Sequence, residues 1–334
     1  MKRLLTYSFI IFACVTGVAQ HFQFSQFYAA PTYLNPAFTG ANACGRFTLN
    51  YRNQWSGVPG TFNTYQASFD HYIKNMKSGI GIQFFQDQAG LGSLTTTQIN
   101  VLYAYEARLN KQLMMRAGFS MGNIQRKVDF GKFTFEDQLA EGTANSLEAL
   151  NYPKINYFDL GTGLLLYSRF AWLGMSFAHL NKPNQSLLNN ISPLPTEFKL
   201  HGGYKFVIED LESSAKRLPE TNFITLAWNY KKQNNFNQLD VGIYYNKNVF
   251  VVGFWYRGLP FFKPEATYAN SDAVIFLMGV NVDRFKIGYS YDLTVSKLTN
   301  MSSRGSHELS MSYMFCKFKR SKKKKNMLIS CPKF

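Results

Sequence analysis

Apolar and polar side chains alternate along much of this chain, most clearly near its C-terminus. From position 284 to 293 the sequence reads Arg-Phe-Lys-Ile-Gly-Tyr-Ser-Tyr-Asp-Leu, so every second residue is aromatic or aliphatic. The stretch 309–315 repeats the pattern, with apolar residues at the odd positions and serines at two of the even ones. Side chains of an extended chain point alternately to opposite faces. Each segment therefore predicts a strand that separates an apolar environment from a polar one.

About fourteen segments of this kind follow one another, and the strong ones have the length of about 9 to 11 residues that a tilted strand needs to cross a bilayer. No comparable stretch has apolar residues at helical spacing. The pattern predicts an all-β, up-and-down antiparallel transmembrane β-barrel of the outer-membrane type, with about 14 strands. The expected strands lie near 46–54, 61–71, 78–86, 94–108, 113–127, 156–167, 170–179, 196–208, 222–232, 237–245, 249–257, 272–281, 284–293 and 308–315.

The connectors between these segments alternate in length. Tight connectors fall at 110–111, 168–169, 246–248 and 282–283, and long ones fall at 129–155, 180–195, 258–271 and 294–307. In bacterial barrels the short turns face the periplasm and the long loops face outside. The connectors 71–77 and 209–221 fit this rule less well. A soluble β-sandwich also alternates, but strand length and connector parity favour the barrel.

The N-terminus predicts export. Positive charges at Lys2 and Arg3, a mostly apolar core and small residues at Gly17 and Ala19 form a secretory signal, with cleavage expected after Ala19. The predicted organisation is a signal peptide at 1–19, a periplasmic or lumenal segment at 20–45, the barrel at 46–315 and a basic periplasmic tail at 316–334. The expected location is the outer membrane.

The net charge and the cysteines add detail to this predicted organisation. The net charge is +16, but ten of the basic residues belong to the signal and the tail, which leaves the barrel region at +6. The export signal argues against a nucleic-acid partner. A disulfide between Cys316 and Cys331 would close the tail into a loop and leave Cys44 unpaired, and free thiols are the alternative.

Catalytic chemistry is not predicted. Gly118-Phe119-Ser120-Met121-Gly122 matches the nucleophile elbow of hydrolases, but it lies inside an alternating strand with no helix after it. The five histidines have no metal-ligand spacing, and His201 is expected to form hydrogen bonds in the lumen. We expect no enzyme activity, no metal and no cofactor.

Charged residues on the polar faces leave the state of the lumen open. They either line a channel or pair with one another across a filled interior, and pairing is favoured because buried charges need partners. The residues concerned are Glu106, Arg108, Arg116, Lys199, Lys205, Lys286 and Asp292.

Several short motifs are more specific than barrel patterning. They are the stretches QFSQFY at 23–28, NPAFTG at 35–40, YRNQW at 51–55, FNTYQASFD at 62–70, GYSYD at 288–292 and SHELS at 306–310, and the Lys-rich tail with Cys331-Pro332. In combination they resemble the PorP/SprF family of type IX secretion and gliding-motility proteins. The resemblance implies a non-enzymatic outer-membrane barrel that supports the export or surface anchoring of a partner, such as a large adhesin. The alternative is an outer-membrane porin or specific transport channel.

Two hypotheses concern the partners, which the resemblance implies are secretion or gliding components, a surface adhesin and outer-membrane lipid. Arg52 and Trp55 lie at the end of the first strand and are candidates for partner binding. The run Lys322, Lys323, Lys324 and Lys325 is a candidate docking segment for an acidic periplasmic partner. Residues 21–40 are expected to lie against the periplasmic mouth or partly inside the lumen.

Overall fold

The computed structural model of the chain describes most of the predicted barrel. The described residues are 23–42, 44–60, 62–90, 94–129, 134, 136–141, 154–187, 190–208, 222–258, 271–295 and 303–315.

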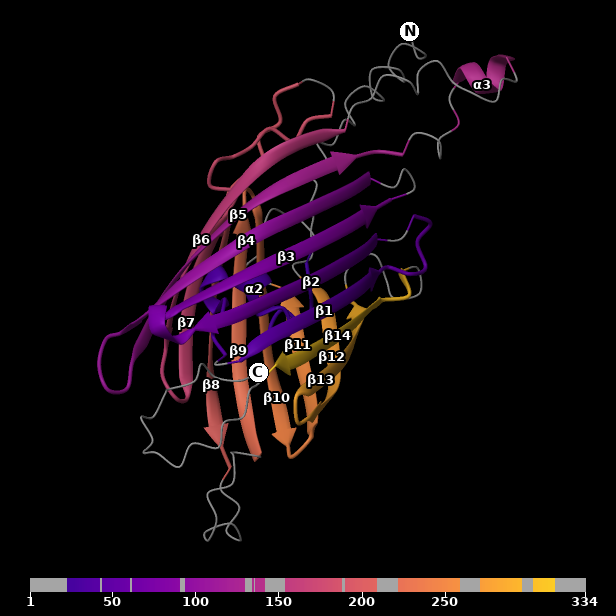
Figure 1. Cartoon of the computed structure of the whole chain (residues 1–334). Coiled ribbons are helices and arrows are strands. Elements are labelled where there is room, and N and C mark those ends of the chain that lie inside the picture. Colours follow the sequence, from indigo (N-terminus) through magenta and orange to yellow (C-terminus); the bar gives the residue numbers. More distant parts are fainter. Residues whose placement is uncertain are drawn as a thin grey trace.

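Within these residues, fourteen antiparallel strands form one closed barrel in which each strand pairs with its neighbours in sequence. This confirms the predicted fold class and strand number. Figure 1 shows the tilted strands forming a wall around the short helix α2 (Pro31–Leu34). The strands are β1 Gly45–Gln54, β2 Phe62–Ile73, β3 Ser78–Ala89, β4 Leu94–Arg108, β5 Met114–Lys127, β6 Ile155–Tyr167, β7 Ala171–Ala178, β8 Glu197–Val207, β9 Asn222–Gln233, β10 Phe236–Lys247, β11 Phe250–Gly258, β12 Ser271–Val282, β13 Phe285–Thr294 and β14 Ser306–Phe315.

The barrel closes where the first strand pairs with the last. The register of β1 and β14 runs without a shift from the pair Gly45 and Phe315 to the pair Gln54 and Ser306. Closure gives each strand a paired neighbour on both sides, which a barrel needs in a membrane because lipid offers no hydrogen-bond partners.

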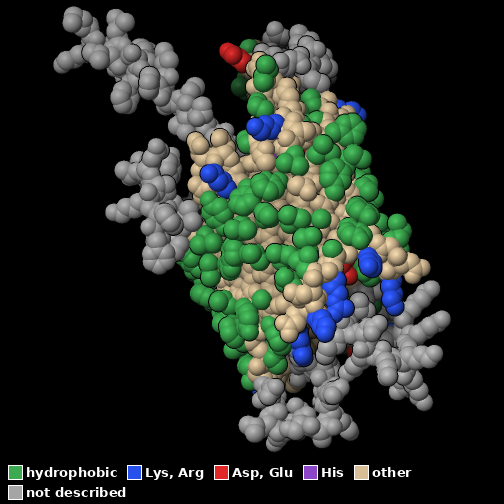
Figure 2. Space-filling model, turned by 90° about the vertical axis from the view of Figure 1, so that its left-hand side faces the viewer, with side chains coloured by type: hydrophobic (Ala, Val, Ile, Leu, Met, Phe, Trp, Pro, Cys, Tyr) green, Lys and Arg blue, Asp and Glu red, His purple; other side chains and the backbone are tan. Residues whose placement is uncertain are grey.

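The two faces of the wall follow the alternation in the sequence. On β14, Leu309 is 50% exposed while Ser310, on the opposite face, is 6% exposed. The outward faces carry mainly exposed Phe, Tyr, Ile, Val, Leu and Met, and the inward faces carry many buried Ser, Thr, Asn, Gln and charged residues. Figure 2 shows apolar side chains covering the middle of one side of the barrel.

The two ends of the barrel differ in their connectors. At the end where β1 begins, which we call the turn end, tight connectors join β4 to β5, β6 to β7, β10 to β11 and β12 to β13, and the 3-10 turn Lys74–Met76 joins β2 to β3. At the opposite end, the loop end, the chain between β7 and β8 is much longer. Three connectors depart from this rule: β8 and β9 are far apart in sequence at the turn end, whereas only four residues join β3 to β4 and two residues join β9 to β10 at the loop end.

The helical elements are short. Besides α2, they are the 3-10 turns Pro36–Phe38 and Lys74–Met76 and the helix α3 (Glu136–Glu141). Among the described residues, none of the helices is long and apolar enough to cross a membrane.

Candidate functional site

Residues 23–40, which we call the lumen segment, lie inside the barrel. Their local fold follows from a few residues. Pro31 begins α2, and the Asn35 side chain accepts a hydrogen bond from the Ala37 N–H at 2.8 Å, which caps the following 3-10 turn. Gly40 leaves the turn with φ of +66°, a conformation that favours glycine. Most of the segment is buried against the wall.

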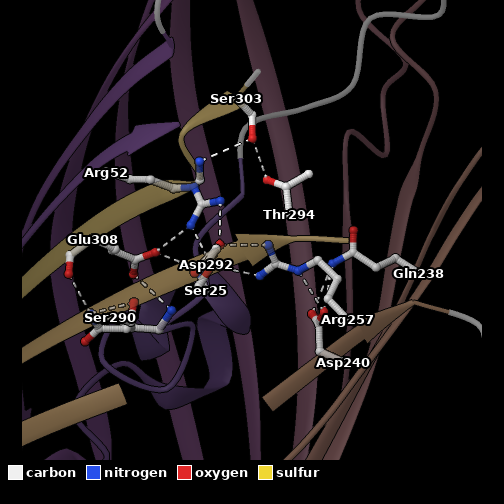
Figure 3. A network of polar contacts seen from close by, with 12 residues as sticks. Ser25, Arg52, Gln238, Asp240, Arg257, Ser290, Asp292, Thr294, Ser303 and Glu308 are labelled. Atoms are coloured by element: carbon white, nitrogen blue, oxygen red, sulfur yellow. Dashed lines mark hydrogen bonds and ion pairs between the residues drawn. The ribbon is translucent and has the colours of Figure 1, made fainter. Parts of the chain in front are cut away.

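One end of the lumen segment is bound by a carboxylate of β14. The Glu308 side chain accepts hydrogen bonds from two consecutive backbone N–H groups, those of Ser25 at 2.6 Å and Gln26 at 2.9 Å. The Ser25 hydroxyl donates to Asp292 Oδ2 at 2.5 Å. The same hydroxyl oxygen accepts from Arg52 Nη1 at 2.5 Å and from Arg257 Nη2 at 3.0 Å. Figure 3 shows the four charged side chains converging on Ser25.

These charges also pair with one another. Arg52 lies 2.8 Å from Asp292 and 3.2 Å from Glu308, and Arg257 lies 2.9 Å from Asp240. The five side chains come from β1, β10, β11, β13 and β14, and each is almost fully buried. Buried charges are tolerated when they are paired and hydrogen-bonded. We call these five residues the interior charge network, and they show that the lumen charges here pair instead of standing unpaired along a channel.

Gln26 fills a position made by small residues. Its side-chain amide donates to Ser290 Oγ at 3.1 Å and to the Glu308 carbonyl at 3.0 Å, and its oxygen accepts from Ser310 Oγ at 2.6 Å. A Cβ on Gly288 would lie only 2.7 Å from that oxygen. Glycine and serine at these wall positions therefore leave room for one glutamine.

Aromatic contacts continue along the segment. The Phe27 ring packs edge-on against Trp255 with centroids 4.9 Å apart, and Tyr28 stacks on the same indole at 6.3 Å. Both rings therefore pack against β11 inside the barrel.

The other end of the segment lies directly on the wall. The Asn35 amide donates to the backbone carbonyls of Leu164 and Met175, each at 3.0 Å, and lies 3.1 Å from His201 Nε2. The predicted hydrogen-bonding role of His201 in the lumen is confirmed.

Glycines of the wall allow this close approach. A Cβ on Gly79 would overlap the Thr39 carbonyl, one on Gly118 would overlap the Ala37 backbone, and one on Gly163 would overlap the Asn35 side chain. Since any larger residue would displace the 35–40 turn, these glycines of β3, β5 and β6 define where it binds.

Arg116 completes the contact with the segment. Its guanidinium donates to the carbonyls of Ala37 at 2.9 Å and Thr39 at 2.5 Å, and to Glu106 at 2.6 Å. The Gly40 N–H donates to Asp70 at 2.7 Å. The lumen segment is thus bound by charged groups at both of its ends.

The structure gives the predicted site residues different surroundings. Arg52 is 2% exposed and binds the chain's own Ser25, so its role here is internal, and partner binding by Arg52 stays untested. Trp55 is half-buried at the loop end, where its backbone N–H donates to the Gly305 carbonyl at 3.0 Å. The candidates Lys322, Lys323, Lys324 and Lys325 lie outside the described residues.

The cysteines depart from one expectation. Cys44 is disulfide-bonded, so the expectation that it stays unpaired is wrong. It directly precedes β1, at the closure of the barrel. Cys316 and Cys331 lie outside the described residues, so the bond expected between them is not tested here.

Ser120 lies within β5, away from any turn between a strand and a helix. The nucleophile-elbow geometry is therefore missing at this motif. Among the described residues, no group of three or more His, Cys, Asp and Glu side chains is arranged to hold a metal ion.

A closed antiparallel barrel with an apolar outer face and a polar interior is an outer-membrane barrel. The family model of the type IX secretion system membrane protein PorP/SprF matches residues 17–313, and the chain belongs to this family.

The chain is also similar to solved structures. The chain is similar to the toluene transporter TbuX of Ralstonia pickettii at 10% identity, covering 86% of this chain and 94% of TbuX with a TM-score of 0.50. It is also similar to the CymD monoaromatic hydrocarbon channel at 11% identity, covering 90% of this chain and 96% of CymD with a TM-score of 0.49. At such low identity the likeness concerns the fold alone. No curated protein sequence matches the chain.

Proposed function

We propose that this protein is a non-enzymatic scaffold in the outer membrane that supports the export or surface anchoring of a partner protein, such as a large adhesin. Membership of the PorP/SprF family supports a place among type IX secretion or gliding components. The apolar outer faces of the strands suit contact with membrane lipid.

The observation that best supports the scaffold role is that the lumen segment occupies the interior of the barrel. The lumen segment contacts the wall on every side: Gln26 reaches β13 and β14, Phe27 reaches β11, Thr32 reaches β3, and Asn35 reaches β6 and β7. A diffusion porin needs a water-filled lumen. The buried segment and its paired charges therefore favour a closed scaffold over the alternative of a porin or specific channel.

Conductance of the purified protein in planar bilayers tests this choice. We expect the wild type to conduct little, and we expect Gly118→Val to conduct more, because its side chain would displace the 35–40 turn. Gly45→Ala is the matched control, since a Cβ there meets only ordinary contacts of 3.4 to 3.5 Å. A large stable conductance of the wild type would support the channel instead.

The partner is sought by pull-down from the native outer membrane. A scaffold should retain a surface protein together with secretion or gliding components, whereas a porin should not. We further propose that Lys322 to Lys325 dock an acidic periplasmic component, so replacing all four with Gln should reduce its recovery. Recovery that is unchanged by the substitution and by salt would argue against docking, because exposed charge contacts weaken with salt.

A further inference from the structure

Basic side chains mark the turn end of the barrel. Each of the five described connectors at this end holds a Lys or Arg, or directly follows one at the end of a strand. The exposed acid in these connectors is Asp283, and the β8–β9 connector lies outside the described residues. Figure 2 shows several Lys and Arg side chains together along one edge of the apolar band. The exposed cations, which we call the basic rim, are Lys74, Lys77, Arg108, Lys111, Arg169 and Lys247.

Four of these cations lie on or beside two neighbouring turns. The Glu106 N–H donates to the Lys77 carbonyl at 2.8 Å, so the β2–β3 and β4–β5 turns lie side by side. The Glu106 carboxylate is itself paired with Arg116 at 2.6 Å, and it therefore compensates a charge inside the barrel. Clustered exposed cations attract anions from the surroundings.

The same turns expose large apolar side chains beside the cations. Met76 lies between Lys74 and Lys77 in sequence and is 60% exposed, and Phe250 lies three residues after Lys247 and is 63% exposed. Water suits the cations but not the apolar side chains, whereas the boundary between lipid headgroups and acyl chains accommodates both. The other exposed apolar residues in or beside these turns are Leu109, Val249, Val282 and Phe285.

The loop end differs in its charges. Three of its connectors, residues 55–61, 90–93 and 234–235, hold no charged residue. In the longer connectors the exposed acids Asp129 and Glu136 occur together with the exposed Lys154 and Lys182. Charges of both signs make the loop end a poorer match than the turn end for a uniformly negative surface.

We propose that the basic rim binds the phosphate groups of anionic phospholipids in the leaflet at the turn end, while the apolar residues beside it contact the acyl chains. An acidic soluble protein would match the cations but would offer no such environment to the apolar side chains, so the lipid is the better fit. The inference rests on the proposed function in one respect, namely that the barrel spans the outer membrane.

Native mass spectrometry of the detergent-solubilised full-length protein measures the choice of lipid. The protein is given equal amounts of phosphatidylglycerol and phosphatidylcholine with the same acyl chains, and the bound lipids are counted. The rim variant Lys74→Gln/Lys111→Gln is compared with the loop-end variant Lys154→Gln/Lys182→Gln, which removes the same charge from exposed positions. Electrophoresis of unheated samples confirms that each variant is a folded barrel.

We expect wild type and the loop-end variant to prefer phosphatidylglycerol. In the rim variant this preference should fall at least about fivefold, the contribution of one cation near an anionic surface. The preference of wild type should weaken with salt but persist in excess inorganic phosphate, because the rim also contacts acyl chains.

Three results would overturn the inference. They are equal binding of the two lipids by wild type, an equal loss of preference in both variants, and complete displacement of the lipid by inorganic phosphate. If the rim variant kept its lipid preference but lost a periplasmic component in the pull-down, the rim would instead bind an acidic protein. None of these results decides the scaffold role, which the conductance measurement tests separately.

Discussion

At the scale of single residues, the interior charge network determines how the lumen segment is bound. Glu308 compensates the charge of Arg52 and accepts the N–H groups of Ser25 and Gln26. Removing one partner of a buried ion pair costs more than the pair contributes, because the other charge and the N–H donors stay buried without a partner.

Glu308→Ala should therefore destabilise the barrel by about 3–5 kcal/mol. The check is urea unfolding of the detergent-solubilised protein followed by tryptophan fluorescence, and Trp255 beside Phe27 should report loss of the lumen segment. Asp283→Asn in the exposed β12–β13 turn is the control and should stay within about 0.5 kcal/mol of wild type. Equal stabilities of the two variants would contradict this role of Glu308.

At the scale of elements, the strands could be predicted from the sequence, whereas the exact position and contacts of the lumen segment could not. All fourteen predicted strands are present. They could be predicted because the outward and inward faces of the wall meet different environments, so apolar and polar residues alternate along each strand. The segment 23–40 has no periodicity, so the sequence indicated only that it lies near or inside the barrel. Its motif residues Gln26 and Asn35 were visible, but their contacts with residues more than 100 positions away were not.

The sequence predicted that charged residues in the lumen form ion pairs, but it did not predict which residues pair with each other. Alternation identified Asp292 and Arg116 as facing inward, and the need of buried charges for partners favoured ion pairs. Which charges meet depends on strand register around the closed barrel, and a single sequence does not give that register. Arg257 and Glu308 were therefore missed as site residues, although their inward positions follow from the same alternation.

The seam between β1 and β14 leads to a prediction about Cys44. Gly45 pairs with Phe315, and a register continued by one residue would bring Cys44 opposite position 316, which is a cysteine in the sequence. We expect Cys44 to be bonded to Cys316, which would replace the bridge between Cys316 and Cys331. Non-reducing peptide mapping by mass spectrometry should give one linked peptide pair that Cys316→Ser abolishes and Cys331→Ser leaves unchanged. The reverse pattern would assign the bond to Cys331.

At the scale of the whole molecule, the proposed scaffold role has two forms, which differ in whether the lumen segment has to leave the barrel. Export through the barrel requires the segment to leave, whereas anchoring at the surface is compatible with a permanently closed lumen. Direct contact of the 35–40 turn with wall glycines, charged partners at both ends and burial along the length all oppose displacement. Anchoring with a closed lumen is therefore the form that we expect.

A disulfide that fixes the segment to the wall tests this expectation. A Cβ on Gly163 would lie 2.8 Å from Asn35 Cγ, and adding one carbon–carbon bond of about 1.5 Å puts the two Cβ atoms at most about 4.3 Å apart, within the range for a disulfide. The variant Asn35→Cys/Gly163→Cys should therefore crosslink under oxidising conditions. Surface display and co-purification of the partner are then compared between oxidised and reduced samples.

We expect the crosslinked barrel to retain its surface partner as well as the reduced sample does, because anchoring does not require the segment to move. Wild type under both conditions controls for reduction of the bond at Cys44, and the single variant Asn35→Cys controls for the lost hydrogen bonds to Leu164 and Met175. Loss of the partner in the oxidised double variant alone would show that the lumen segment leaves the barrel during export. In that case the closed lumen would be only the resting state of an export channel. The oxidised and reduced double variants differ in whether the lumen segment can move, so a difference in partner retention would be due to that movement.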